Sequence, residues 1–317
     1  MKKLAIAISA ILASGTVYAG NEAGVQLNDS LDDDVTITQN TTLANLSLGN
    51  DVTVGLQTTE NNEIAILQTG NLNNSEVLAT NAEDSFFDVT QTGNNNTASI
   101  TTFGATNTGN DVDIVQQGNL NNSSVSVDGG SSNVANINIQ GFDNVTEASF
   151  NGSGANGNTV LNTINDGSRN NSVTNTVNGG TGNTADVLIQ DGWTNQITTT
   201  QNGSGSQADI DVTDFSDNNT VSLTQNDTNT ASVTIDGASW TNSVTISQYN
   251  NNSVDIDLVD NSDSNILTVT QSTNDSSALV SLTSSDSNAV SISQNAWDVA
   301  SVYGTNAVNA TVTILQN

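Results

Sequence analysis

Apolar and polar residues alternate with a period of two along most of the chain, and one alternating pattern recurs. The pattern has seven residues, opens with Asn, closes with Gln and carries apolar residues at its third and fifth positions. Four copies begin 23 residues apart, at Asn219, Asn242, Asn265 and Asn288, and end at Gln225, Gln248, Gln271 and Gln294. Because a period of two places alternate side chains on opposite faces of an extended chain, each copy predicts a β-strand.

The same pattern occurs elsewhere in the chain. Further copies run from Asn62 to Gln68, Ser85 to Gln91, Asn110 to Gln116 and Asn195 to Gln201, and Gln316 closes the last one. A second alternating segment, such as residues 229–235 or 252–258, lies between consecutive copies. Each repeat therefore reads as strand, turn, strand, turn in about 23 residues, and residues 62–317 hold about eleven repeats.

This repeat predicts an all-β fold. The turns are short and rich in Gly, Asn, Asp and Ser, and the period is too short for a propeller blade. We therefore expect a β-solenoid of eleven or more rungs, an amyloid-like coil of two sheets. Equivalent residues in successive rungs then lie about 4.8 Å apart, so stacked Asn and Gln amides can donate to one neighbour and accept from the other. These residues are predicted to form ladders.

The glutamine spacing changes within the chain. Gln116 and Gln201 are 85 residues apart, which is about three and a half repeats. The ladder is therefore expected to move from one strand of the repeat to the other, with a more irregular glycine-rich region at about 141–182. The positions that would continue the first ladder hold Ile139, Ile164 and Ile189.

The N-terminus resembles an export signal. Lys2 and Lys3 precede a short apolar run, and Val17-Tyr18-Ala19 forms a small-x-small cleavage site. Residues 1–19 are predicted to be a signal peptide, with a retained anchor as the alternative. Residues 20–61 are expected to hold a targeting segment and irregular first rungs, and 62–317 the repeats. No later run has the roughly 20 apolar residues of a membrane-spanning helix, so no membrane insertion is expected.

The composition excludes several functions. The chain has 33 acidic residues against 3 basic ones, no Cys and no His. Nucleic acids and anionic lipids are poor partners for such a chain. Thiol and imidazole chemistry is absent, and no convergent catalytic set is visible, so we expect neither an enzyme nor a bound cofactor or metal.

Three minor features each have a functional interpretation and a simpler one. Outward Asp pairs occur at Asp111 and Asp113, Asp209 and Asp211, and Asp255 and Asp257. They could bind calcium, although charge for solubility is the simpler explanation. Thr-x-Thr pairs, as on ice-binding faces, do not recur in every rung. Tryptophans occur in or beside turns, at Trp193, Trp240 and Trp297. Packing within the turn is the simpler role for these, and carbohydrate stacking the alternative.

The motif Gln-x-Gly-x-x-Asn appears in three copies, as Gln68-x-Gly70-x-x-Asn73, Gln91-x-Gly93-x-x-Asn96 and Gln116-x-Gly118-x-x-Asn121. It resembles the curlin repeat of bacterial curli subunits. The resemblance implies a secreted subunit that polymerises outside the cell as functional amyloid in biofilm matrix and adhesion. It also implies other curlin subunits as partners and export through an outer-membrane pore, guided by an unpaired segment, here 20–32. Curlin repeats usually carry Gln on both strands, and familiar subunits have about five repeats, so this chain departs from the pattern.

These observations predict a secreted, cell-surface structural subunit that polymerises with itself. The final strand, with Val312, Ile314 and Gln316, is expected to be the polymerising end, because an open rung exposes unpaired backbone groups. The alternative is a monomeric surface or secreted solenoid that acts as an adhesin or binding protein.

Overall fold

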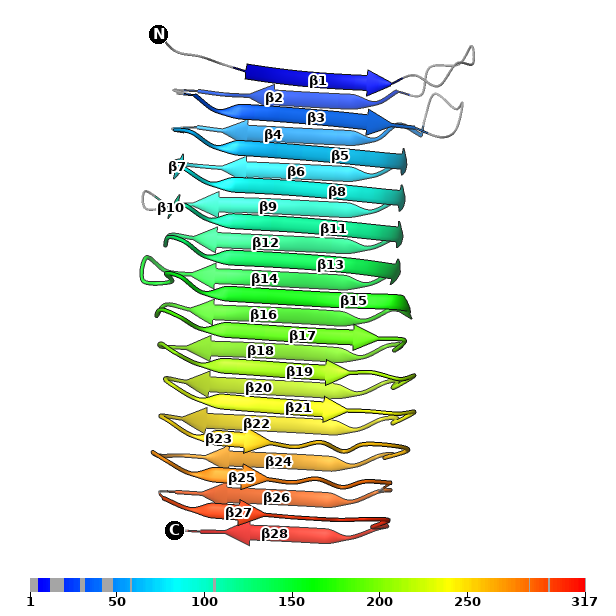
Figure 1. Cartoon of the computed structure of the whole chain (residues 1–317), viewed down its shortest axis with the longest axis vertical. Coiled ribbons are helices and arrows are strands. Elements are labelled where there is room, and N and C mark those ends of the chain that lie inside the picture. Colours follow the sequence, from blue (N-terminus) through cyan, green and yellow to red (C-terminus); the bar gives the residue numbers. More distant parts are fainter. Residues whose placement is uncertain are drawn as a thin grey trace. The chain divides into compact units, whose positions relative to one another are not determined.

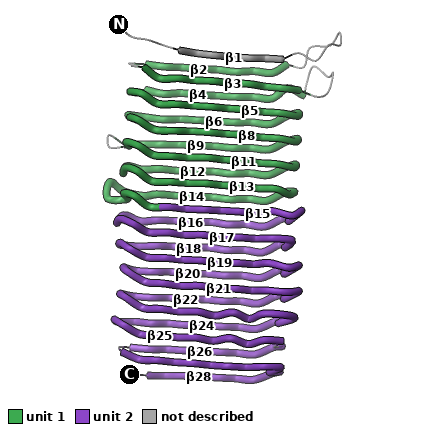
Figure 2. Tube along the Cα trace, in the orientation of Figure 1, with its two compact units in different colours: residues 1–158 green, residues 159–317 purple. Residues whose placement is uncertain are grey.

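The chain is built of β-strands, with no helix among the described residues, in a computed structural model (Figure 1). The structure describes residues 5–11, 20–28, 32–41, 48–57, 59–104, 107–284, 286–295 and 297–316. It divides into two compact units, residues 1–158 (unit 1) and 159–317 (unit 2) (Figure 2). In each unit, parallel strands stack as a β-solenoid with rungs roughly 23 residues apart. The predicted all-β solenoid is therefore confirmed.

Each rung contributes one strand to a first sheet and the next strand to a second sheet. In unit 1 the first sheet contains β1 (Ala5–Ile11), β3 (Asp34–Asn40), β5 (Glu63–Asn71), β8 (Phe86–Asn94), β11 (Asp111–Asn119) and β13 (Val134–Phe142). The second sheet contains β2 (Glu22–Gln26), β4 (Asp51–Leu56), β6 (Asn74–Ala79), β9 (Thr97–Phe103), β12 (Asn122–Asp128) and β14 (Val145–Asn151). Two short strands, β7 (Ala82–Glu83) and β10 (Asn107–Thr108), pair beside the turns.

Unit 2 repeats this arrangement. Its first sheet contains β15 (Thr159–Arg169), β17 (Thr184–Gln190), β19 (Gln207–Val212), β21 (Thr230–Ile235), β23 (Ser253–Asp255), β25 (Ser277–Leu279) and β27 (Val299–Ser301). Its second sheet contains β16 (Ser172–Asn178), β18 (Gln196–Asn202), β20 (Thr220–Asn226), β22 (Ser243–Tyr249), β24 (Ile266–Gln271), β26 (Ala289–Gln294) and β28 (Thr311–Leu315).

The strands pair in parallel with equivalent residues in register. Gln91 of β8, for example, lies beside Gln68 on one side and Gln116 on the other. Burial alternates along each strand as the period of two predicts, and the inward Val and Ile side chains, such as Val89 and Ile114, have no exposed surface. Removing such side chains from water contributes roughly 1.5–3 kcal/mol each, so the thin core between the sheets is the main stabilising element.

The turn within a rung, from its first-sheet strand to its second-sheet strand, has a recurring backbone conformation. We call it the intra-rung turn, and the turn to the next rung the inter-rung turn. One residue of the intra-rung turn has a positive φ, as in Leu72 (57°), Asn95 (55°) and Leu120 (62°). This left-handed residue reverses the chain sharply, so the Asn that follows it, such as Asn73, lies inside the coil rather than in an exposed turn.

Three expectations from the sequence are corrected. Residues 22–26, predicted to be an unpaired targeting segment, form β2 and pair with β4. The strands of the first rungs pair in register, as β3 does with β5. The strands of the glycine-rich middle are also regular, because most of its glycines lie in turns and burial still alternates along β15 and β16, with Ile164 and Val173 fully buried.

The predicted signal peptide lies largely outside the described residues. Its residues 5–11 form β1, which pairs with β3 from Ala5 and Asp34 onward. Cleavage after Ala19 stays a prediction. No helix within the described part of the chain is long and apolar enough to cross a membrane.

Candidate functional site: the amide ladders

A continuous glutamine ladder runs through the core of unit 1. The side-chain Nε2 of Gln68 donates to Oε1 of Gln91 (2.9 Å), and Gln91 donates to Gln116 (2.8 Å). The second hydrogen of Gln68 Nε2 is donated to the carbonyl oxygen of Asp51 in the opposite sheet (2.9 Å). Gln39 extends the ladder by donating to Gln68 (3.0 Å), a member that the sequence analysis missed. Each amide is buried, and hydrogen bonds offset the cost of removing it from water.

Unit 2 contains a longer glutamine ladder on the second sheet. Consecutive Nε2-to-Oε1 distances of 3.1, 3.1, 3.0, 2.9 and 3.1 Å link Gln201, Gln225, Gln248, Gln271, Gln294 and Gln316. The column therefore lies on first-sheet strands in unit 1 and on second-sheet strands in unit 2, the change of strand that the spacing predicts. In the preceding rung, the residue paired with Gln201 is Val177, which has no amide. The buried Gln201 Oε1 therefore has no hydrogen-bond partner within the described residues.

An asparagine ladder follows the intra-rung turns of unit 2. Asn219 donates from Nδ2 to Asn195 Oδ1 (3.2 Å), and the same oxygen accepts the backbone N–H of Asn219 (2.9 Å). Its other Nδ2 hydrogen goes to the carbonyl oxygen of Ser239 (2.8 Å). The same pattern continues through Asn242, Asn265 and Asn288. Each asparagine thus fastens its turn to the rung on either side.

The two remaining predicted asparagines lie elsewhere, at inter-rung turns of unit 1. Asn62 donates to the carbonyl oxygen of Ala82 (3.0 Å), and its Oδ1 accepts the backbone N–H of Ser85 (3.0 Å). Ser85 Oγ in turn accepts the backbone N–H of Asn110 (3.3 Å). The predicted asparagines therefore belong to two different columns.

The Gln-x-Gly-x-x-Asn motif has a structural reason that the sequence alone did not reveal. Asn96 Nδ2 donates to Asn73 Oδ1 (3.2 Å) and to the carbonyl oxygen of Gly118 (2.9 Å). Gly93 has φ of 125°, and a Cβ there would lie 1.7 Å from the carbonyl oxygen of Gly118. Glycine is therefore needed where the turns stack, and the third residue after it is a buried ladder member.

The tip of the last described rung is more open than the rungs before it. Val312 and Ile314 of β28 are partly exposed, whereas the equivalent Val290 and Ile292 of β26 are 3% and 1% exposed. Gln316 accepts from Gln294 and is partly exposed as well. On its other side, β28 pairs with no strand among the described residues. Among the described residues, the backbone groups and side-chain columns of β28 are thus covered on one side only.

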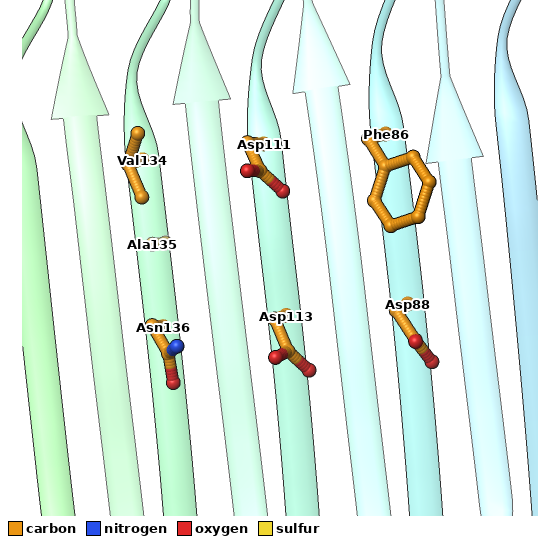
Figure 3. Close-up of a pocket in the computed structure, with 7 residues that line it drawn as sticks. All are labelled: Phe86, Asp88, Asp111, Asp113, Val134, Ala135 and Asn136. Atoms are coloured by element: carbon orange, nitrogen blue, oxygen red, sulfur yellow. The ribbon is translucent and has the colours of Figure 1, made fainter.

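Acidic residues form a row on the outer face of the first sheet in unit 1. Asp88 of β8 and Asp111 and Asp113 of β11 point to the same side, beside Asn136 of β13 (Figure 3). The pKa of Asp113 is raised, mainly by partial burial and to a lesser extent by repulsion from Asp111. Partial burial, and then repulsion from Asp113 and Glu63, raises the pKa of Asp88. Within the described residues, no group of three or more acidic side chains is placed to hold a metal ion.

The raised pKa values give a pH prediction. A carboxyl whose pKa is higher in the folded state stabilises the fold fully below its unfolded pKa, and this contribution is lost as pH rises through the folded pKa. Asp113→Asn removes the repulsion, so its melting temperature at pH 7 should rise on the order of 1–3 °C and change less between pH 3 and 7 than in the parent. Asp128→Asn, at an exposed strand end, is the matched control. Equal behaviour of the two variants in thermal melts would contradict the prediction.

The fold and its ladders define a parallel β-solenoid repeat protein with buried amide columns. No protein-family model and no curated protein matches the chain in sequence.

Proposed function

We propose that this chain is a secreted structural subunit that assembles with itself into extracellular, curli-like amyloid fibres for biofilm matrix and cell adhesion. The role is structural rather than enzymatic. The resemblance of its motif to the curlin repeat adds other curlin subunits and a curli-type secretion pore as partners. In-register parallel strands with stacked amides are the arrangement found within amyloid fibrils, which supports the proposal.

The open edge of β28 is the observation that carries this proposal. Its backbone groups, and the partly exposed Val312, Ile314 and Gln316, form an unfinished rung. A strand that adds to this edge gains backbone hydrogen bonds and buries the apolar column. Growth by templating follows, because each added subunit presents the same edge again. Such a contact is not closed by symmetry and produces a filament.

Processing of the N-terminus would change the edge at the start of unit 1. Because β1 lies within residues 1–19, cleavage after Ala19 would remove it from β3. The edge of β3 would then lie beside that of β2, which pairs only with β4 among the described residues. Cleavage would thus present mature strands in both sheets to a preceding subunit.

The proposal is tested on residues 20–317 released from denaturant. We expect dye-binding fibres with a reflection near about 4.8 Å, and faster growth when preformed fibres are added as seeds. A stable β-rich monomer that neither binds the dye nor responds to seeds would overturn the proposal. That result would favour the alternative, a monomeric surface or secreted adhesin.

The edge itself is tested by Ile314→Lys. A charge at this inward position would be buried when the next subunit adds, so we expect seeded growth to slow about tenfold while the monomer keeps its β-sheet circular dichroism. Thr313→Lys is the control, because Thr313 is the exposed neighbour on the same strand. Growth of Ile314→Lys at the parental rate would show that β28 is not the growing edge.

A further inference from the structure

Three aromatic residues lie in the intra-rung turns of unit 2. These turns are at the right of that unit in Figure 1. Trp193, Phe215 and Trp240 are 52%, 66% and 53% exposed. They lie in the turns β17–β18, β19–β20 and β21–β22, which belong to three successive rungs. Only 4% of the residues are aromatic, so three exposed aromatic residues in successive rungs form a local concentration that a binding partner can use.

Backbone hydrogen bonds fix these turns in register. Asn218 N donates to the carbonyl oxygen of Trp193 (2.9 Å), and Thr241 N donates to that of Asp217 (3.1 Å). Trp193, Asp217 and Trp240 therefore occupy equivalent positions in three rungs. The backbone positions of the two tryptophans are therefore two rungs, about 10 Å, apart along the stacking direction.

The backbone that carries the two tryptophans is held in place locally. The backbone N–H of Trp193 donates to Asp217 Oδ1 (2.7 Å), and that of Trp240 donates to Asp263 Oδ1 (2.8 Å). The indole N–H of Trp240 also reaches the carbonyl oxygen of Phe215 (3.4 Å). The turns therefore need no rearrangement of their backbone to present these residues, which lowers the entropic cost of binding.

Carboxylates surround the aromatic row. Asp217 and Asp263 lie within its own column, and a second acidic group adjoins it, made up of Asp191, Asp214, Asp236 and Asp260. A hydrogen bond with Asp236, then partial desolvation and repulsion from the neighbouring carboxylates, raises the pKa of Asp214. A bound cation would relieve this repulsion. The Arg169 guanidinium already lies 5.8 Å from the centre of the Trp193 ring, so the site accommodates a cation over an indole.

We propose that Trp193, Phe215 and Trp240, with their flanking aspartates, bind a linear polysaccharide that carries free amino groups. The apolar faces of successive sugar rings would stack on the indoles, since both the polymer and the platform repeat along a line. The ammonium groups would pair with the carboxylates. Binding through this aromatic row requires only one folded unit, so it applies to the monomer and to the fibre.

A basic peptide fits the aromatic row less well. An extended peptide derives much of its affinity from main-chain hydrogen bonds. Here the backbone N–H groups of Trp193, Trp240, Asn218 and Thr241 are all engaged within the protein. Recognition therefore depends on ring faces and carboxylates, which a polymer of sugars can use throughout its length.

The experiment measures binding of a glucosamine hexamer to the full chain by calorimetry at physiological salt. Trp193→Ala with Trp240→Ala should weaken binding about tenfold or more. Trp297→Ala is the matched control, because Trp297 is 78% exposed but lies in an inter-rung turn. Asp217→Asn with Asp263→Asn should also weaken binding, since Asn keeps the acceptor for the turn but removes the charge.

A second control separates a site from general charge. Asp209→Asn with Asp211→Asn removes two charges from β19 in the same unit and should leave binding unchanged. An equal loss of binding affinity in the two double aspartate variants would overturn the proposal in favour of non-specific charge attraction. Equally tight binding of the N-acetylated hexamer would overturn the amino-group requirement. If an arginine-rich peptide bound more tightly than the glucosamine hexamer, and its binding depended on the two tryptophans, the aromatic row would be assigned to a protein partner instead.

Discussion

Replacing Gln248 by Glu is expected to lower the free energy of unfolding by about 3–5 kcal/mol at pH 7. Gln248 is fully buried, donates to Gln271 Oε1 and to the carbonyl oxygen of Thr230, and accepts from Gln225. An ionised carboxylate at this position keeps the acceptor role but loses both donors. It also places a negative charge against two oxygen atoms in a low-dielectric core.

The measurement is urea unfolding followed by tryptophan fluorescence, since all three tryptophans, Trp193, Trp240 and Trp297, are in unit 2. Burial raises the pKa of the new carboxyl. The loss of stability caused by its charge should therefore be absent below its unfolded pKa of about 4.3 and should grow as pH rises through the folded pKa. Gln196→Glu, on the exposed face of β18, is the control. Equal stability of Gln248→Glu and Gln196→Glu at pH 7 would refute the buried ladder.

Replacing Gly93 by Ala is expected to cost about 3 kcal/mol in unit 1. The added methyl group would lie 1.7 Å from the carbonyl oxygen of Gly118, and φ of 125° is unfavourable for any residue with a Cβ. The turn would have to open, and the hydrogen bond from Asn96 Nδ2 to Gly118 would be lost with it.

Hydrogen exchange of β8 and β11 measures this effect locally, because a solenoid transmits stability mainly between neighbouring rungs. Protection should fall at these strands and stay near the parental level in β26. Gly24→Ala is the control, since a Cβ at Gly24 meets no atom within 4 Å. Unchanged protection around Gly93 would mean that the stacked turns do not require glycine.

The strand pattern could be predicted because burial in a thin two-sheet coil requires strict alternation. Val221 and Leu223 were assigned to the inner face from their spacing alone, and both are 1% exposed. Gln39 was missed because 29 residues, rather than about 23, separate it from Gln68. A longer turn changes the sequence period but leaves the register of the paired strands unchanged.

The ladder asparagines of unit 1 were harder to predict. Asn73, Asn96 and Asn121 close the Gln-x-Gly-x-x-Asn motif, in segments that the sequence predicts to be turns between strands. Only the positive φ of the preceding residue directs them inward. Likewise, the sequence placed Trp193 and Trp240 in turns but could not align them, because alignment depends on which turns stack. Phe215, two residues before the equivalent position in its rung, escaped notice for the same reason.

The hydrogen bonds of the ladders also have a direction. Each glutamine in the two columns, apart from the last of each column, donates to the glutamine of the following rung. In contrast, asparagines of the intra-rung turns such as Asn96 and Asn219 donate from Nδ2 to the Oδ1 of the preceding asparagine. On the side that faces the next rung, a rung therefore presents glutamine donors and asparagine acceptors. On the side that faces the previous rung, it presents glutamine acceptors and asparagine donors. Two subunits that met through the same side would oppose donor to donor and acceptor to acceptor. A fibre built from this chain would consequently have a fixed polarity, with chemically distinct ends that elongate at different rates.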